Sequence, residues 1–376
     1  MAHAYTPGLK VLHETKVLKE RRLPLKGEVL VAKGAAVEPE TVVAKTDLPG
    51  NVQMVNVANQ LNADPSDVSD LMLIKEGGQI SKGEVLAESP GIFGLFKSKV
   101  ISPTDGTVES ISAVTGQVVL REHPIPVEID GYSQGTVKEV IPEEGVIVET
   151  TAAFIQGIFG IGGENRGILH MVVESRDEEI TPDKITPDFA GKIIVGGSFI
   201  SLETYQKAIE NKVNGVVVGG FNYHDLKTIL GYTLGVAITG SEDLATTLIV
   251  TEGYGKIRIG QRTFDLLRKH EGKAASINGA TQIRAGVIRP EIVIPLPPEE
   301  ITGTPKAIHS SEGIQKGSLV RIIRAPYFGR MGTVVALPSK LHQMESETMV
   351  RVAEVEIDGD RMLIPRANLE MVETDL

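Results

Sequence analysis

The sequence predicts a multi-domain, β-rich α+β protein, and three observations lead to this fold class. First, 376 residues with 41% hydrophobic side chains are enough for two to four separate cores. Second, 40 glycines and only 4% aromatic residues are typical of short strands of Val, Ile and Leu joined by turns. Third, short strands alternate with capped helices over residues 191–294, which predicts a small α/β domain with a parallel sheet there.

The composition excludes several classes of chemistry. With no cysteine, the chain has no disulfide, thiolate nucleophile, iron–sulfur cluster or cysteine-bound zinc. A net charge of −11 argues against a general nucleic-acid binder. There is no apolar run of roughly eighteen residues and no apolar signal core, so we expect a cytoplasmic protein without membrane insertion. The lack of Cys and Trp leans towards a thermophilic source.

Residues 1–26 are basic on an otherwise acidic chain. They carry six basic residues against two acidic ones, Glu14 and Glu20. Two interpretations stay open: a solvated tail, or an arm that docks on an acidic surface of a neighbouring subunit. The residues expected to make that oligomer contact are Lys16, Lys19, Arg21 and Arg22.

Residues 27–175 contain an internal repeat. The segment Val31–Ala44 can be laid over Ile74–Ala87 with a constant offset of 43, which aligns the turn glycines and the start of a short strand. The run Ser102-Pro103-Thr104-Asp105-Gly106-Thr107-Val108 follows the second copy. The whole region is therefore predicted to form one β domain built from related turns and strands.

This pattern resembles the barrel-sandwich hybrid fold of biotinyl and lipoyl carrier domains, of the Rnf electron-transport C subunit and of membrane-fusion adaptors. The resemblance implies a lysine at a hairpin tip if the domain is a carrier. The comparable tip here reads Thr46-Asp47-Leu48-Pro49-Gly50, and the second copy offers Ser89-Pro90-Gly91, both without a lysine at the turn. We therefore expect a scaffold that binds no cofactor.

An acidic linker is predicted at residues 176–190, where Thr181-Pro182-Asp183 and Thr186-Pro187-Asp188 repeat a turn. In the α/β domain that follows, Ser201, Asn222 and Ser241 are placed to cap three helices. The ends of the expected strands carry Gly196, Gly197, Gly219, Gly220, Thr239 and Gly240. Because ligands of parallel sheets bind at these strand ends, the six residues are the candidate ligand crevice. Acidic residues in the first helical turns favour simple capping over an anion or nucleotide site.

Two arginines near the end of the α/β domain are candidate partner contacts. Arg284 and Arg289 lie in a segment that Asn278-Gly279 is expected to fold into a hairpin. A hairpin that presents these guanidinium groups to an acidic partner is the preferred interpretation. A Pro-rich linker, residues 295–309, leads to the last domain.

Residues 310–376 begin with a predicted strand, turn and strand over Lys316–Val335. This segment resembles the KOW motif of NusG-type transcription factors and ribosomal proteins, matched at Gly317, Val320–Ile322, Pro326–Gly329 and Gly332–Val334. The resemblance implies an SH3-like barrel. Contacts with RNA or a partner are expected at Arg321, Arg324, Tyr327, Phe328 and Arg330, because the arginines bind phosphates or carboxylates and the aromatic rings stack on bases.

Three functions are left open by the sequence. The last domain is basic from Ser310 to Lys340 and acidic from Leu341 to Leu376, which suits head-to-tail contacts in a homo-oligomeric, non-catalytic scaffold or adaptor. The KOW resemblance alone implies a factor that contacts RNA, the ribosome or RNA polymerase weakly. The crevice allows a small-ligand or nucleotide site. No H-E-x-x-H motif occurs and the histidines are scattered, so we expect no metal and lean away from an enzyme.

Overall fold

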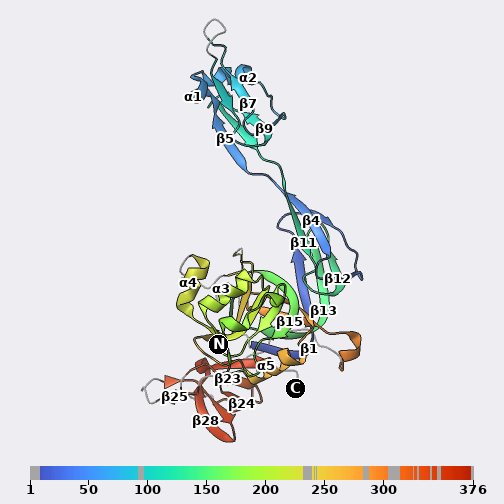
Figure 1. The fold of residues 1–376 in the computed structure, drawn as a ribbon, viewed down its shortest axis with the longest axis vertical. Coiled ribbons are helices and arrows are strands. Elements are labelled where there is room, and N and C mark those ends of the chain that lie inside the picture. The colour runs from blue at the N-terminus through green and yellow to red at the C-terminus, as the bar shows by residue number, and fades with distance from the viewer. Residues whose placement is uncertain are drawn as a thin grey trace.

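The protein has a wide body that carries one long arm (Figure 1). This computed structural model describes residues 9–91, 97–231, 239, 240, 242, 244–282, 288–303, 314–324, 326, 327, 330–338, 341–344 and 349–373. Strands hold 46% and helices 15% of the described residues, which confirms the β-rich prediction. Within these ranges, no helix is both long and apolar enough to cross a membrane.

The body is built on a long mixed sheet with β13 (Gly145–Gln156) at its centre. β13 pairs antiparallel with β1 (Leu9–Arg22) on one side and β22 (Glu291–Pro295) on the other. From β22 the pairings continue through β21 (Ala274–Asn278), β15 (Glu164–Met171), β17 (Ile193–Val195), β19 (Gly215–Phe221) and β20 (Thr247–Tyr254) to β14 (Phe159–Ile161). Because β14 follows β13 after two residues, this circuit of strands closes on itself.

Three helices cover the parallel strands β17, β19 and β20. They are α3 (Leu202–Glu210), α4 (Tyr223–Leu230) and α5 (Gln261–Lys269). The side chains of Ser201 and Asn222 accept hydrogen bonds from the first turns of α3 and α4, so two of the predicted caps are confirmed. The side chains of α3 and α4 pack on one face of the sheet, and those of α5 pack in the core on the other face. The third predicted cap, Ser241, lies outside the described residues, and β20 runs parallel to β19.

The arm consists of two β modules, one inserted into the other. The proximal module contains β2 (Glu28–Val29), β3 (Ala36–Val37), β4 (Val42–Leu48), β11 (Ile125–Asp130) and β12 (Gly135–Ile141). The distal module contains β5 (Val52–Asn56), α1 (Val57–Leu61), η1 (Pro65–Asp67), α2 (Val68–Leu71), β6 (Gln79–Ile80), β7 (Val85–Glu88), β8 (Lys99–Ile101), β9 (Gly106–Ile111) and β10 (Gln117–Arg121). Each module has its own apolar core, so the prediction of one domain over 27–175 is wrong.

The predicted repeat corresponds to these two modules. β3 and β6 align at the offset of 43, as do the first residues of β4 and β7. Gly34 and Gly77 both have positive φ, +85° and +81°, and both donate their amide hydrogens to a valine carbonyl in the following half of the module. The segment Leu48-Pro49-Gly50 is not a hairpin tip, because the chain continues through it from β4 into β5 of the distal module. A Cβ at Gly50 would lie 2.0 Å from the carbonyl oxygen of Glu122, where the two segments that connect the modules cross.

The C-terminal strands form a small unit with its own apolar core. They are β23 (Leu319–Ile322), β24 (Met331–Ala336), β25 (His342–Gln343), β26 (Met349–Val350), β27 (Val352–Ile357), β28 (Asp360–Pro365) and β29 (Leu369–Glu373), with η5 (Arg366–Asn368) before the last. β23 and β24 pair antiparallel, which confirms the predicted strand, turn and strand. β29 also pairs parallel with the start of β1, so the unit is joined to the sheet of the body.

Two predicted boundaries are wrong. Residues 9–22 of the basic arm form β1, which is hydrogen-bonded to β13 along nearly its whole length. The acidic linker is part of the body: it contains β16 (Glu179–Ile180), η2 (Pro182–Lys184) and η3 (Pro187–Phe189), and Ile180 and Ile185 are buried in the core under α3. The burial of Ile180, before the first turn, and of Ile185, between the two turns, holds this segment on the body. The Pro-rich linker begins as the end of β22 and continues in η4 (Pro298–Glu300).

The buried His270 predicts a pH dependence of stability. Its side chain is 1% exposed at the end of α5, and its ring nitrogens have no hydrogen-bond partner among the described residues. Burial, together with the charges of Lys273 and Lys269, lowers the pKa of His270 from 6.5 to about 4. The unfolded chain therefore binds this proton at higher pH than the folded one, and the free energy of unfolding should fall between about pH 6.5 and 4. In urea unfolding, the free energy of unfolding of His270→Gln should depend less steeply on pH between 6.5 and about 4 than that of wild type. The variant His224→Gln, at an exposed histidine, should keep the wild-type pH dependence. Equal slopes for wild type and His270→Gln would contradict this.

Candidate functional site

Five of the six predicted crevice residues are glycines, and at four of them other parts of the chain approach the backbone closely. Gly196, Gly197, Gly219 and Gly220 lie at the ends of β17 and β19. A Cβ at Gly219 would lie 2.0 Å from the carbonyl oxygen of Ile257, and one at Gly220 would lie 1.9 Å from that of Gly255. Gly196 meets the side chain of Ile180 in the same way, at 2.4 Å. These glycines allow close packing of neighbouring loops, which occupy the space where the ligand was expected.

The other two predicted crevice residues also have structural contacts. The hydroxyl of Thr239 is buried and donates to the carbonyl oxygen of Gly160 at 2.7 Å. It accepts from the amide of Thr281 at 3.0 Å. Gly240 has φ of +110°, and a Cβ there would lie 2.5 Å from that of Ala280. Both residues therefore fasten the segment after β21 to β14.

The predicted contact loop of the C-terminal unit is only partly available to a partner. Arg324 is exposed, whereas Tyr327 is half-buried against the core of this unit. Arg330 forms an ion pair with Asp358, and Phe328 lies outside the described residues. Arg321 is 6% exposed, so its prediction as a surface contact is wrong.

Arg321 belongs to a buried ionic network that fastens the C-terminal unit to the body. Its guanidinium group pairs with Glu252 on β20 and donates to Glu370 on β29 at 2.5 Å. Arg289 donates to the other oxygen of Glu370 at 2.9 Å. All four side chains are at most 10% exposed. Arg289 therefore faces the chain itself and not a partner, and its predicted companion Arg284 lies outside the described residues.

The cations of β1 are likewise paired within the chain. Lys16 contacts Glu149 at 3.0 Å, Lys19 pairs with Glu291, and Arg22 pairs with Glu20 and with Glu144 at 2.5 Å. The interpretation of these residues as oligomer contacts assumed that the acidic partners lay on another subunit. The antiparallel pairing of β1 with β13 instead brings the acids of this same chain beside them.

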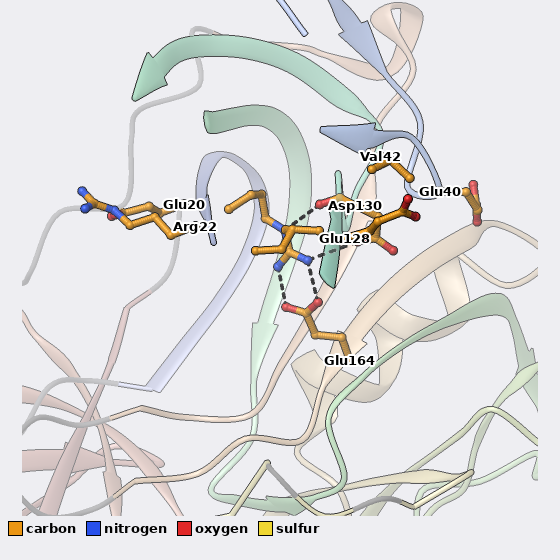
Figure 2. A pocket seen from close by; sticks show the side chains of 9 residues that line it. Glu20, Arg22, Glu40, Val42, Glu128, Asp130 and Glu164 are labelled. Atoms are coloured by element: carbon orange, nitrogen blue, oxygen red, sulfur yellow. Dashed lines mark hydrogen bonds and ion pairs between the residues drawn. The ribbon is translucent and has the colours of Figure 1, made fainter. Parts of the chain in front are cut away.

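Arg21 joins the arm to the body (Figure 2). It donates to both carboxylate oxygens of Glu164 on β15, at 2.6 and 2.8 Å. It also donates to the backbone oxygen of Asp130 at 2.8 Å and to its carboxylate at 3.1 Å, at the end of β11. Arg166, on β15, binds the second oxygen of the Asp130 carboxylate at 2.6 Å. Burial opposes the charge of Arg21, but the hydrogen bond and charge of Glu164 raise its pKa.

Tyr132 is the apolar half of the same joint. It follows β11 with a φ of +63°, and this turn directs the ring into a small core with Val17, Phe154 and Val293, where it is 3% exposed. Its hydroxyl contacts the carboxylate of Glu291 at 3.0 Å, and its backbone oxygen accepts from the hydroxyl of Ser276 at 2.5 Å.

Two cations lie over the ring of Tyr132. The Lys19 ammonium is 5.5 Å and the Arg21 guanidinium 5.4 Å from the ring centre. Burial, and after it the charge of Glu291, raises the pKa of Tyr132 well above its ordinary value. The tyrosine ring therefore stays neutral. Lys19 and Arg21 on β1 contact the arm at this one ring.

A pocket of about 480 Å³ opens beside this joint. It is lined by Glu20, Arg21, Arg22, Glu40, Val42, Glu128, Ile129, Asp130 and Glu164 (Figure 2). Carboxylates outnumber cations, but Glu164 and Asp130 are held by Arg21, and Glu40 is held by Arg166 at 3.3 Å. In the described part of the chain, no group of three or more His, Asp or Glu side chains could hold a metal ion. The charges here fix the position of the arm.

The comparisons with known proteins place the chain in no family. No protein-family model matches it, and no curated protein matches it at a significant level. The site is therefore judged on its own geometry.

Sequence reasoning found two residues of this joint, Lys19 and Arg21, and gave them the wrong partners. It missed Tyr132, Asp130 and Glu164. A usable signal was present in Asp130-Gly131-Tyr132-Ser133, where a turn dipeptide precedes an aromatic residue in a chain with only 4% of them. The acids on β15 gave no such signal, because their role depends on a strand more than 140 residues from Arg21.

Removing Arg21 should loosen the joint. In Arg21→Ala, the carboxylates of Asp130 and Glu164 lose their shared cation, and we expect a loss of about 2 kcal/mol in the free energy of unfolding. This is below the cost of breaking a fully buried pair, because Glu164 is 38% exposed. The neighbouring Arg22→Ala is the matched control, since its side chain is 51% exposed and its removal should change little. Equal losses in urea unfolding of the two variants would refute the assignment.

Proposed function

We propose that the chain is a non-catalytic scaffold or adaptor that self-associates, with the body as the platform and the arm as the docking element. The observation that carries this is the arm: two nested modules project from the body and are fastened at the base by Arg21 and Tyr132 (Figure 1). Apolar side chains are exposed on its distal module: Val52 47%, Met54 68%, Leu73 59%, Ile101 59% and Val114 87%. Exposed apolar residues on a projecting, fastened element favour protein–protein contact.

We also infer that each arm module is a barrel-sandwich hybrid and that the C-terminal unit is an SH3-like barrel of the KOW type. The matching turns and strands of the two copies support the first inference. The order β28–β27–β24–β23–β29, with a short helix before the last strand, supports the second. In the proximal module, the place of a carrier hairpin tip is taken by the entire distal module, so this copy serves as a stalk.

Self-association predicts a molar mass above that of one chain. Light scattering on the full-length protein at tens of micromolar should give at least the mass of a dimer, because weak assemblies have a Kd around this concentration. We expect the assembly to survive moderate salt, because the cations of β1 are already paired within the chain. A single-chain mass at every concentration and salt would reject the scaffold proposal.

Association with RNA is the alternative function that the KOW resemblance implies. Arg321 is buried, and the exposed Arg330 is paired with Asp358, which leaves Arg324 as the exposed arginine without an ion pair in the described part of this loop. We therefore expect little affinity for single-stranded RNA at physiological salt, measured by fluorescence anisotropy. A low nanomolar Kd would make association with RNA the preferred function in place of the scaffold. In that case Arg324→Ala combined with Arg330→Ala should weaken binding and reduce its salt dependence.

A further inference from the structure

The distal module ends in a sheet edge that carries none of the usual protections. β5 is the outer strand of the sheet β5–β10–β9–β6 and pairs with β10 alone. Its sequence, Val-Gln-Met-Val-Asn, contains no charge and no proline, and its register with β10 has no bulge. Such an edge offers unpaired backbone groups to another strand.

The hydrogen-bond pattern shows which groups of β5 face outward. Just before β5, Glu122 donates its amide hydrogen to the carbonyl of Asn51. In an antiparallel pair, alternate residues bond to the partner strand, so Gln53 and Val55 bond to β10. Val52, Met54 and Asn56 therefore turn their backbone N–H groups away from it, as do the C=O groups of Val52 and Met54, whereas the C=O of Asn56, the N-cap of α1, accepts the first bond of that helix. Of these, Val52 and Met54 also have exposed apolar side chains.

Two other outer strands of at least five residues in the described chain are protected. β11 is the outer strand of the sheet β11–β4–β2, and it contains Pro126 and Glu128. β28 pairs with β27 and carries Asp360, Arg361 and Pro365. Charges and prolines at these edges prevent pairing with another chain. Their absence from β5 is thus a local property of the arm tip.

We propose that β5 pairs with β5 of a second copy, antiparallel, about a two-fold axis through Met54. The proposal rests on the self-association proposed above and assigns it a surface. Val52 of one copy lies opposite Asn56 of the other, and Met54 lies opposite Met54. The two four-stranded sheets become one continuous sheet across the axis.

A second copy fits this edge for three reasons. The outward residues are spaced symmetrically about Met54, so antiparallel self-pairing joins the two Met54 residues by their backbone groups and brings Val52 opposite the outward N–H of Asn56. The strand is uncharged, so identical copies meet without like-charge repulsion. β5 runs along the side of the distal module, so antiparallel pairing sets two arms side by side in opposite directions and keeps the bodies apart (Figure 1).

Opposite charges at Met54 test the symmetry directly. In Met54→Lys, two ammonium groups face each other across the axis, and in Met54→Glu two carboxylates do, so each variant should self-associate about tenfold more weakly than wild type or worse. An equimolar mixture places Lys opposite Glu and should recover association. Sedimentation velocity on the full-length proteins measures all three samples. Leu73→Lys, at another exposed apolar residue of the distal module, is the matched control and should behave as wild type.

The outcomes separate this proposal from the scaffold proposal. If wild type associates and both charge variants do so equally well, the β5 contact is wrong and self-association stands on another surface. If each variant dissociates but the mixture does not recover, the two-fold pairing at Met54 is wrong. A wild type that stays monomeric refutes both proposals. Weakening by Leu73→Lys equal to that by Met54→Lys would show a nonspecific apolar contact and also overturn the assignment.

Discussion

The architecture depends on how the arm is held to the body at Tyr132 and Arg21. The strands β1 and β13 run through both parts, but two strands alone leave the angle of the arm open. Tyr132 fixes that angle by inserting its ring into the body, and Arg21 fixes it by bridging β11 and β15. Burial of the aromatic ring stabilises the joint but sets no particular angle, whereas the bidentate ion pair has strict geometry and sets the angle of the arm. Every contact made at the arm tip is positioned by this joint.

Buried and half-buried ion pairs join the main parts of the molecule. The arm is joined to the body by Arg21, and the C-terminal unit is joined by Arg321 with Glu252 and Glu370. Such pairs add less net stability than apolar packing, because both charges lose water. Their geometric demands are strict, however, so they select one relative placement of domains. This explains how an acidic chain uses its basic residues mainly on itself.

The nested arrangement of the two modules explains why the arm is long and narrow. An insertion at a hairpin tip extends a module along its own strand direction, and both connecting chains cross at one neck. There, Gly50 and Glu122 come so close that no Cβ fits, and Asn51 donates to the Glu122 carboxylate at 3.0 Å. Side chains from Asn51 and Thr104 lower the pKa of Glu122, which keeps this acceptor ionised and the neck bonded. The arm therefore places the distal module, with its uncharged edge, far from the body.

The sequence alone determined the features that short-range chemistry controls. The repeat was visible because turn glycines must occupy positive φ in both copies, the caps of α3 and α4 because their side chains bond within one turn, and the β23–β24 pair because its turn is local. Tertiary structure decided the rest. The basic segment 16–22 became part of β1 beside β13, the glycines at strand ends became packing sites, and Arg321 became buried, since each outcome depends on partners far along the chain. Charge and turn chemistry name the groups that need a partner, and only the long-range pairing of strands determines which partner each one meets.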